Sequence, residues 1–232
     1  MALRPIYTNA IDALRDVPDG ASIMVGGFSA GLGAPDLLLR TLQDETRVRD
    51  LTFIGNGTPT ARSGDPENPF FSFDHERVRK LICSFPTAAT RRGMVSPYNA
   101  AIEEGRIELE LVPQGTLAER LRAGGAGIPA FFTPTGVGTD FAAGKEVREF
   151  DGRLYVMERA IRADYAFIRA FKADKLGNLF YRNTARAFSP VMAMAAACTI
   201  AEVEEIVEPG EISPDEIATP GIYVHRIVLR KQ

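Results

Sequence analysis

The chain has 232 residues, of which 45% are hydrophobic and 25% charged, and its formal net charge is −3. These values are ordinary for a globular protein that buries one large core, and they include no basic run for nucleic acid or an anionic membrane. No apolar stretch reaches the roughly 18 residues of a membrane-spanning helix, and the N-terminus lacks the pattern of a secretory signal. We therefore expect a single domain over residues 1–232, located in the cytoplasm, with Cys83 and Cys198 as free thiols.

Short apolar runs alternate with amphipathic segments along the first half of the chain. A first helix is expected from Thr8, as its cap, to about Asp16. The apolar runs predict strands at 22–25, 51–54, 81–84 and 107–112, and the amphipathic segments predict helices at 36–44, 98–104 and 116–123. This alternation predicts an α/β fold with three layers, α/β/α, around a largely parallel sheet.

The pattern changes between about residues 130 and 160, where Gly, Thr and Phe are frequent. A hairpin over 145–153, turning at Asp151-Gly152, predicts a small antiparallel excursion from the main sheet. Beyond it we expect a turn at Gly177-Asn178, a helix at 190–198, and strands at 165–171, 199–207 and 222–229. Residues 58–68 are polar and contain prolines, and they are expected to form a surface loop.

The segment 19–35, DGASIMVGGFSAGLGAP, is the most informative part of the sequence. An apolar run ends in Gly26-Gly27-Phe28, and further glycines precede the helix predicted at 36–44. Glycines at such a place let backbone N–H groups approach a ligand, and the positive end of the helix favours an anion. Pyrophosphate, a carboxylate or a developing oxyanion would each fit. A tight strand-to-helix turn without a ligand is the alternative.

Several segments, in the same order along the chain, resemble the family I coenzyme A transferases, in their α subunit or N-terminal half. They are GGFSAGLGAP (26–35), VPQGTLAERLRAGGAG with IPAFFTPTGVGT (112–139), KEVREFDGR (145–153), DYAFIRAFKADKLGNLFYRNTAR (164–186) and TIAEVEEIVEPGEISPDEIATPGIYVHRIV (199–228). The chain departs from the family pattern twice. Four residues instead of three separate Gly-Gly-Phe from the next Gly-x-Pro, and Gly55-Asn56-Gly57-Thr58 stands where the family has Asn-Asn-Ala/Cys-Gly. Both departures fall where the family shapes its substrate pocket, so the acid and the acyl-CoA stay open.

The resemblance implies an α subunit that works with a β subunit, expected as an α2β2 heterotetramer. Such enzymes move CoA from an acyl-CoA such as succinyl-CoA to a 3-oxoacid, here of the acetoacetate or 3-oxoadipate type, with ping-pong kinetics. Their nucleophile is a glutamate in a Ser-Glu-Asn-Gly motif of the β subunit, whereas the one Glu-Asn pair here, Glu67-Asn68, precedes Pro69. We therefore expect no catalytic residue on this chain, no metal and no permanently bound cofactor, with the coenzyme A thioester as a substrate.

Two groups of site residues follow. Backbone amides of the glycine-rich loop are expected to stabilise an oxyanion or to line the CoA path: Gly26, Gly27, Phe28, Ser29, Ala30, Gly31 and Leu32. Asn56 and Gln114 each follow a predicted strand, at the edge of the sheet where α/β enzymes bind ligands. A neutral amide can hold a substrate carboxylate without the salt bridge that would quench its nucleophilicity. The alternative for both residues is a loop or helix cap.

Other candidates are open to simpler interpretations. Arg91-Arg92 could recognise the second carboxylate of a diacid or form an exposed basic pair. His75 and His225 are far apart in sequence and lack partners at metal-ligand spacing. The Phe-rich stretch 130–141 is expected to contribute to the contact with the β subunit. The competing function is an α/β domain that binds a small molecule without CoA chemistry, or a sugar-phosphate isomerase, which would need a carboxylate base and a phosphate-binding lysine in one cleft.

Overall fold

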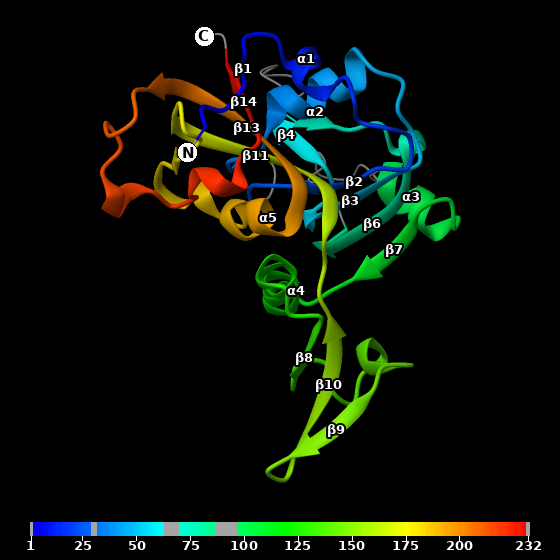
Figure 1. The fold of residues 1–232 in the computed structure, drawn as a ribbon. Helices are drawn as coiled ribbons and strands as arrows, with labels where there is room; N and C mark the ends of the chain where they lie inside the picture. The colour runs from blue at the N-terminus through cyan, green and yellow to red at the C-terminus, as the bar shows by residue number, and fades with distance from the viewer. Residues whose placement is uncertain (1, 29–31, 63–69, 87–96, 231–232) are drawn as a thin grey trace.

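The computed structural model describes residues 2–28, 32–62, 70–86 and 97–230 (Figure 1). Within these residues a nine-stranded sheet forms the centre of the molecule, and its main path runs β1-β14-β13-β11-β2-β3-β6-β7 with every neighbouring pair parallel. The ninth strand, β12 (Leu179–Phe180), pairs antiparallel with β11. The strands of the path are β1 Ile6–Tyr7, β2 Ser22–Val25, β3 Leu51–Gly57, β6 Val78–Phe85, β7 Glu108–Leu111, β11 Ala163–Asp174, β13 Ala196–Val207 and β14 Arg226–Leu229.

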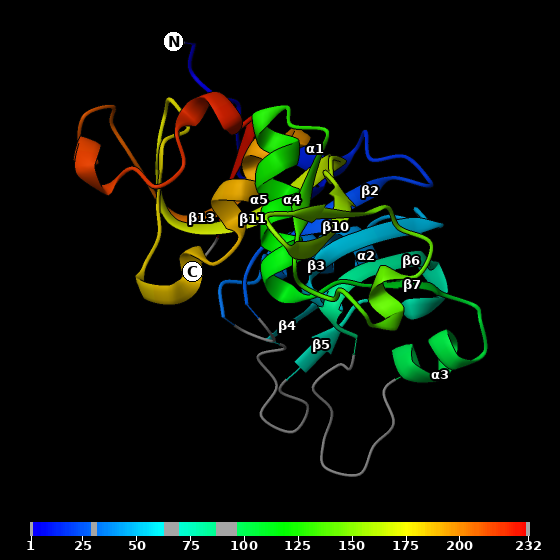
Figure 2. The same ribbon diagram turned by 90° about the horizontal axis from the view of Figure 1, so that it is seen from below.

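Helices cover both faces of this sheet. One face packs against α1 (Ala10–Leu14), α2 (Asp36–Asp44) and α3 (Pro97–Glu103), and the other against α4 (Gln114–Ala126) and α5 (Ser189–Ala195), which lie side by side (Figure 2). Short 3₁₀ helices are η1 His75–Arg77, η2 Asp140–Ala142, η3 Asn183–Arg186, η4 Pro214–Glu216 and η5 Gly221–Tyr223. No helix in the described parts of the chain is long and apolar enough to cross a membrane.

Each central strand contributes to two hydrophobic cores, because successive side chains point to opposite faces. Ile23 and Val25 pack in the core under α1 to α3, whereas Met24 between them packs in the core under α4 and α5. Burial on both faces is why β2 is a continuous apolar run rather than an alternating one. The three-layer α/β/α architecture with a largely parallel sheet is thereby confirmed.

A second, antiparallel sheet stands away from this body (Figure 1). It consists of β8 (Ala130–Thr133), β10 (Arg153–Arg159) and β9 (Val147–Phe150), with β10 in the middle, and we call residues 130–159 the arm. The hairpin turns at Asp151 and Gly152, whose φ angles are 49° and 77°. These are left-handed values that Asp and Gly tolerate. The predicted antiparallel excursion is confirmed.

Three boundaries were predicted wrongly, each because pairing between distant segments decided them. The predicted helix at 8–16 begins only at Ala10, with Asn9 at its N-cap and no side-chain cap, because residues 6–7 pair with β14 as an edge strand. The predicted helix at 190–198 ends at Ala195, since Ala196 already pairs with Ala163 of β11. The last strand begins at Arg226, after η5.

The expected surface loop at 58–68 contains a strand. β4 (Thr60–Arg62) pairs antiparallel with β5 (Phe70–Ser72), and the remaining residues of the loop, 63–68, lie outside the described residues.

Candidate functional site

Two side-chain amides meet at the carboxyl edge of the sheet. Asn56 lies near the end of β3, and Gln114 is the first residue of α4, which follows β7. The Gln114 Nε2 group donates a hydrogen bond to Asn56 Oδ1 over 2.6 Å, although 58 positions separate the residues in sequence. Asn56 is buried and Gln114 is partly buried. The structure therefore brings together the two residues predicted to bind the acid.

A serine lies beside this amide pair. The register of β3 and β6 pairs Gly55 with Cys83 and Gly57 with Phe85, so Ser84 lies directly across from Asn56. Both side chains project to the face that carries α4, as do Ile54 and Ile82 two positions earlier. The Ser84 hydroxyl is buried and has no hydrogen-bond partner in the described part of the chain. A buried hydroxyl without a partner is uncommon and calls for a functional explanation.

The glycine-rich loop packs against its own chain. A Cβ atom on Gly27 would lie 2.7 Å from the Ala34 nitrogen, and Gly27 has a φ of +93°, so only glycine fits there without strain. A Cβ on Gly33 would lie 2.5 Å from the Ala185 carbonyl oxygen, and one on Gly26 would lie 2.7 Å from the Ser189 hydroxyl. These close approaches explain the glycines by packing within the chain.

The amides of this loop are unequally available. Gly26 N–H donates to the Phe167 carbonyl over 2.9 Å, and Phe28 N–H donates to the Leu32 carbonyl over 2.8 Å. Gly27 N–H makes no backbone hydrogen bond to any described residue. Of these three predicted donors for an oxyanion, Gly27 is thus the one whose amide the described backbone does not engage. Ser29, Ala30 and Gly31 lie outside the described residues.

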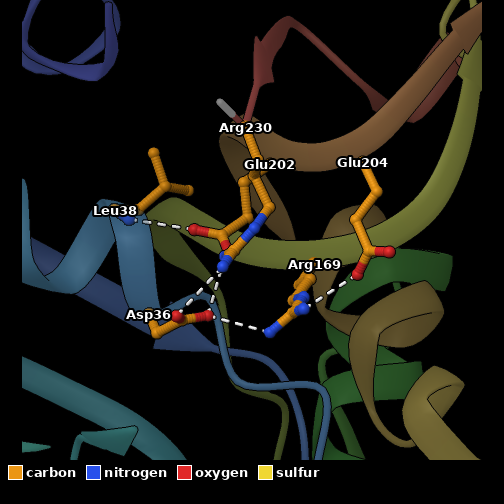
Figure 3. A network of polar contacts seen from close by, with 6 residues as sticks. All are labelled: Asp36, Leu38, Arg169, Glu202, Glu204 and Arg230. Atoms are coloured by element: carbon orange, nitrogen blue, oxygen red, sulfur yellow. Dashed lines mark hydrogen bonds and ion pairs between the residues drawn. The ribbon is translucent and has the colours of Figure 1, made fainter. Parts of the chain in front are cut away.

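The N-terminus of α2 already holds an anion that the protein supplies (Figure 3). Glu202 of β13 is fully buried, and its carboxylate accepts a hydrogen bond from the Leu38 amide over 2.9 Å. Arg230 binds both Glu202 and Asp36, the first residue of α2, and Arg169 joins Asp36 to Glu204 at 2.9 and 2.8 Å. The expectation that this helix end attracts a ligand anion is therefore corrected, because Glu202 occupies the position.

The charges of this network differ in their titration. Burial raises the pKa of Glu202 to about 8, against the opposing effect of Arg230. Burial also acts to raise the pKa of Asp36, but hydrogen bonds and charge from Arg230 and Arg169 outweigh it and leave the pKa lowered. Asp36 thus remains ionised at neutral pH, while Glu202 is the group that holds a proton most tightly.

A pocket of about 270 Å³ lies next to this network. Its walls come from the end of the glycine-rich loop, from the second half of β11, from the segment around η3, and from β13: Leu32, Gly33, Arg169, Ala170, Phe171, Tyr181, Arg182, Asn183, Thr184, Ala185 and Glu204. The Arg182 guanidinium lies over the Phe171 ring at 3.4 Å from its centroid. Leu32 is the member of the predicted loop that reaches this pocket.

The remaining candidates are located elsewhere or outside the described residues. Arg91 and Arg92 are not described, and neither is Glu67-Asn68. His225 accepts a hydrogen bond from the Thr199 amide at its Nδ1, over 2.9 Å, and burial lowers its pKa. In the described ranges no group of three or more His, Cys, Asp or Glu side chains could hold a metal ion.

Sequence reasoning missed the polar network and Ser84, although each left a signal. Glu202 stands at a core position of an apolar strand, between Ala201 and Val203, where an acidic residue needs a buried partner. Ser84 ends the apolar run of β6 in the same way that Asn56 follows that of β3. The partner Arg230 carries no local signal, since only the fold brings it to α2.

Known proteins similar to this chain agree on its relationship. The sequence model of the family described as coenzyme A transferase matches residues 7–230. The chain is 47% identical over 222 residues to the α subunit of the 3-oxoadipate CoA-transferase of Pseudomonas putida, covering 96% of this chain and 92% of that protein. It is 45% identical over 224 residues to the α subunit of the probable succinyl-CoA:3-ketoacid coenzyme A transferase of Bacillus subtilis, covering 97% and 89%.

Solved structures share the fold. The acyl-CoA transferase YdiF of Escherichia coli O157:H7, in a thioester complex with CoA, superposes with a TM-score of 0.78 at 22% identity. That comparison covers 98% of this chain and 50% of the E. coli chain, so this chain spans about half its length. Glutaconate coenzyme A-transferase from Acidaminococcus fermentans gives a TM-score of 0.78 at 21% identity, covering 97% and 75%. From the match over nearly its whole length, the chain belongs to the coenzyme A transferase family.

Proposed function

We propose that this chain is the α subunit of a heteromeric coenzyme A transferase, and that its acid substrate is a 3-oxoacid of the acetoacetate or 3-oxoadipate type. The observation that carries the proposal is the similarity over 96% of the chain, at 47% identity, to a protein named as one subunit of a 3-oxoadipate CoA-transferase. That name implies a companion chain, the β subunit. An α2β2 assembly in the cytoplasm is the expected form.

The proposed reaction proceeds by ping-pong transfer, with its nucleophile on the β subunit. A glutamate carboxylate attacks the thioester carbon of an acyl-CoA, the C–S bond breaks, and CoA leaves as a thiolate. The thiolate then attacks the glutamyl carbonyl of the resulting anhydride, which releases the first acid and leaves a glutamyl-CoA thioester. The second acid reverses both steps and leaves as its CoA thioester. No ATP is needed, because each thioester is made as another is broken.

Asn56 and Gln114 are proposed to hold the acid during this exchange. Their mutual hydrogen bond uses the carbonyl of Asn56 and one N–H of Gln114, so the pair still has the Asn56 NH2 group and a second Gln114 N–H as donors. Such neutral donors orient a carboxylate without protonating it. The Ser84 hydroxyl, buried across from Asn56, would supply a third donor. Gly27 N–H remains the proposed donor to an oxyanion on the side of the glycine-rich loop.

The test uses the chain together with the β subunit. The purified chain alone should not transfer CoA, and the reconstituted pair should turn over succinyl-CoA with a 3-oxoacid. Treatment of the pair with acyl-CoA and then borohydride should modify one glutamate, on the β subunit. A modified glutamate on this chain, or full turnover by this chain alone, would show that the division of labour is wrong. A panel of acids then separates the acetoacetate from the 3-oxoadipate type.

A ligand-binding domain without CoA chemistry is the second candidate. It predicts binding of an acid by this chain with no transfer by the reconstituted pair under any donor. No specific contact among the described residues favours the sugar-phosphate isomerase alternative.

A further inference from the structure

The arm is an unusual part of the molecule because it has little to pack on. It leaves the body between α4 and β11 and points away from the central sheet (Figure 1). All four residues of β9 are exposed. A three-stranded sheet of this size needs a hydrophobic face buried against something to be stable. Whatever buries the arm is therefore expected to come from outside this chain.

The two faces of the arm differ, and only one is covered near the root. Along β10, Val156 and Glu158 project to one face and are buried, with 0% and 2% of their surface exposed. Tyr155 and Met157 project to the other face, which we call the aromatic face. Strand pairing adds further residues to this face, and its members are Phe132, Arg148, Phe150, Arg153, Tyr155 and Met157.

The aromatic face is preformed. The rings of Phe132 and Phe150 lie 5.3 Å apart edge to face, and those of Phe150 and Tyr155 lie 5.5 Å apart. Arg148 lies over Phe132 at 5.4 Å and Arg153 over Tyr155 at 5.8 Å. Phe150 still has 44% of its surface exposed. Aromatic residues, Met and Arg are the types enriched in protein interfaces, and Tyr and Arg are frequent among the residues that dominate binding.

The root of the arm is fixed to the body by buried charges. Glu158 binds Lys145 at 2.5 Å and lies 3.6 Å from Arg120 of α4. Arg120 also donates to the Arg159 carbonyl at 2.7 Å and binds Glu110 of β7 at 2.7 Å. The arm is thus held in one orientation relative to α4, the helix that begins with Gln114. A surface that is already ordered loses less conformational entropy on binding.

We propose that the aromatic face of the arm is a docking surface for the β subunit. The inference rests on the proposed function, since the companion chain is implied only by relatives whose names describe them as subunits. The aromatic rings would insert into an apolar depression, and the arginines at their edge favour a partner surface that carries carboxylates. Because the arm is tied to α4, this contact would also place the partner against the helix that carries Gln114.

Two exposed side chains on opposite faces of the arm provide a matched test. Phe150→Glu puts a charge on the aromatic face, and Leu154→Glu puts the same charge on the other face, where Leu154 is 49% exposed. Affinity for the purified β subunit is measured by titration, and the assembly by light scattering. We expect Phe150→Glu to weaken binding by about 30-fold or more, as for a residue that dominates an interface, and Leu154→Glu by less than about threefold.

Each outcome separates this inference from the proposed function. If the wild-type pair transfers CoA and Phe150→Glu keeps wild-type affinity for the β subunit, the docking inference is wrong and the function stands. The inference is also wrong if the chain alone forms a dimer that Phe150→Glu dissociates while its affinity for the β subunit is unchanged, because the occupant is then a second copy. Binding lost by Phe150→Glu alone, in a pair that transfers no CoA, would support the docking surface and contradict the function. A melting temperature of each variant within a few degrees of wild type shows that it is folded.

Discussion

Two helices begin at the carboxyl edge of the same sheet, and the chain completes their N-termini in opposite ways. At α2, Asp36 stands in the first turn and the buried Glu202 binds the Leu38 amide, so the protein supplies the anion itself (Figure 3). At α4 the first turn has no acidic residue and begins with Gln114, which binds Asn56. A glycine-rich loop before a helix therefore does not mark an anion site until the chain's own carboxylates are accounted for.

The comparison assigns different tasks to the two ends. The α2 end is a structural junction that fastens a helix to β11, β13 and β14 through Arg169, Glu202 and Arg230. The α4 end offers neutral donors at a half-buried position, which suits a carboxylate that must remain reactive. Substitutions at α2 should thus act on stability, and substitutions at α4 on catalysis.

The largest expected effect is that of Arg230→Met at the α2 end. Removing the guanidinium leaves Asp36 and Glu202 together without their shared partner, and breaking a buried ion pair costs about 3–5 kcal/mol. Urea unfolding monitored by circular dichroism measures the loss. Arg226→Met on the same strand is the control, because it removes a pair with the half-exposed Asp16 and should cost roughly 1 kcal/mol or less. Equal losses in the two variants would contradict the structural role of the network.

Gln114→Ala should produce the opposite pattern. With the β subunit present, we expect kcat/KM for the acid to fall about tenfold, since a hydrogen bond contributes about 1 kcal/mol and the buried Asn56 loses its partner. Stability should change by less than about 1 kcal/mol. Gln43→Ala is the control: its side chain accepts a hydrogen bond from the Asp74 amide, far from the α4 end in sequence and on α2. If both variants lower kcat/KM equally, Gln114 has no specific role.

Ser84→Ala sharpens the same assignment with a smaller effect. The hydroxyl has no partner to lose among the described residues, so the folded protein should be as stable as wild type or slightly more stable. If the hydroxyl binds the acid, KM for the acid should rise by about three- to tenfold. Ser22→Ala, which removes a hydroxyl bound to Asp164 at 2.6 Å, should leave KM unchanged. An unchanged KM in Ser84→Ala would remove this residue from the pocket.

The pH dependence of stability gives the smallest and most specific signal from the α2 end. The pKa of Glu202 is about 8 in the folded chain, well above the ordinary glutamate value of 4.5 that applies when the chain unfolds. Its protonation therefore stabilises the fold fully below about pH 4.5, and this contribution is lost as the pH rises through 8. Asp36, with a lowered pKa, stays ionised over that range. We expect Glu202→Gln to flatten the fall in melting temperature between about pH 5 and 8, and an unchanged slope would contradict the raised pKa.

The fold was largely predictable because its signals are local. Strand β2 and helix α2 have the predicted bounds, since a buried parallel strand is a continuous apolar run and an amphipathic helix repeats its leucines every three to four residues. The edge strand β1 was missed, because two residues that pair with the far end of the chain leave no periodic pattern. The end of α5 was misplaced for a related reason. A run of alanines fits helix and strand alike, and pairing with β11 decides between them.

The site was predictable in part. Asn56 and Gln114 could be found because each follows a strand, and strand ends of a parallel sheet meet at one edge. The occupant of the α2 end could not be found in this way. Glu202 and Arg230 belong to the last third of the chain, and only the assembled sheet places them beside a helix that begins at residue 36.

A crystal structure of the assembled α and β chains with a non-reacting 3-oxoacid analogue tests the central claim most directly. The account predicts that the carboxylate of the analogue lies within about 3.2 Å of a side-chain nitrogen of Asn56 or Gln114, close to the Ser84 hydroxyl. The α2 end should keep its bond from Leu38 to Glu202. An analogue bound instead at the N-terminus of α2, or in the pocket lined by Arg169 and Arg182, would contradict the assignment of the two helix ends.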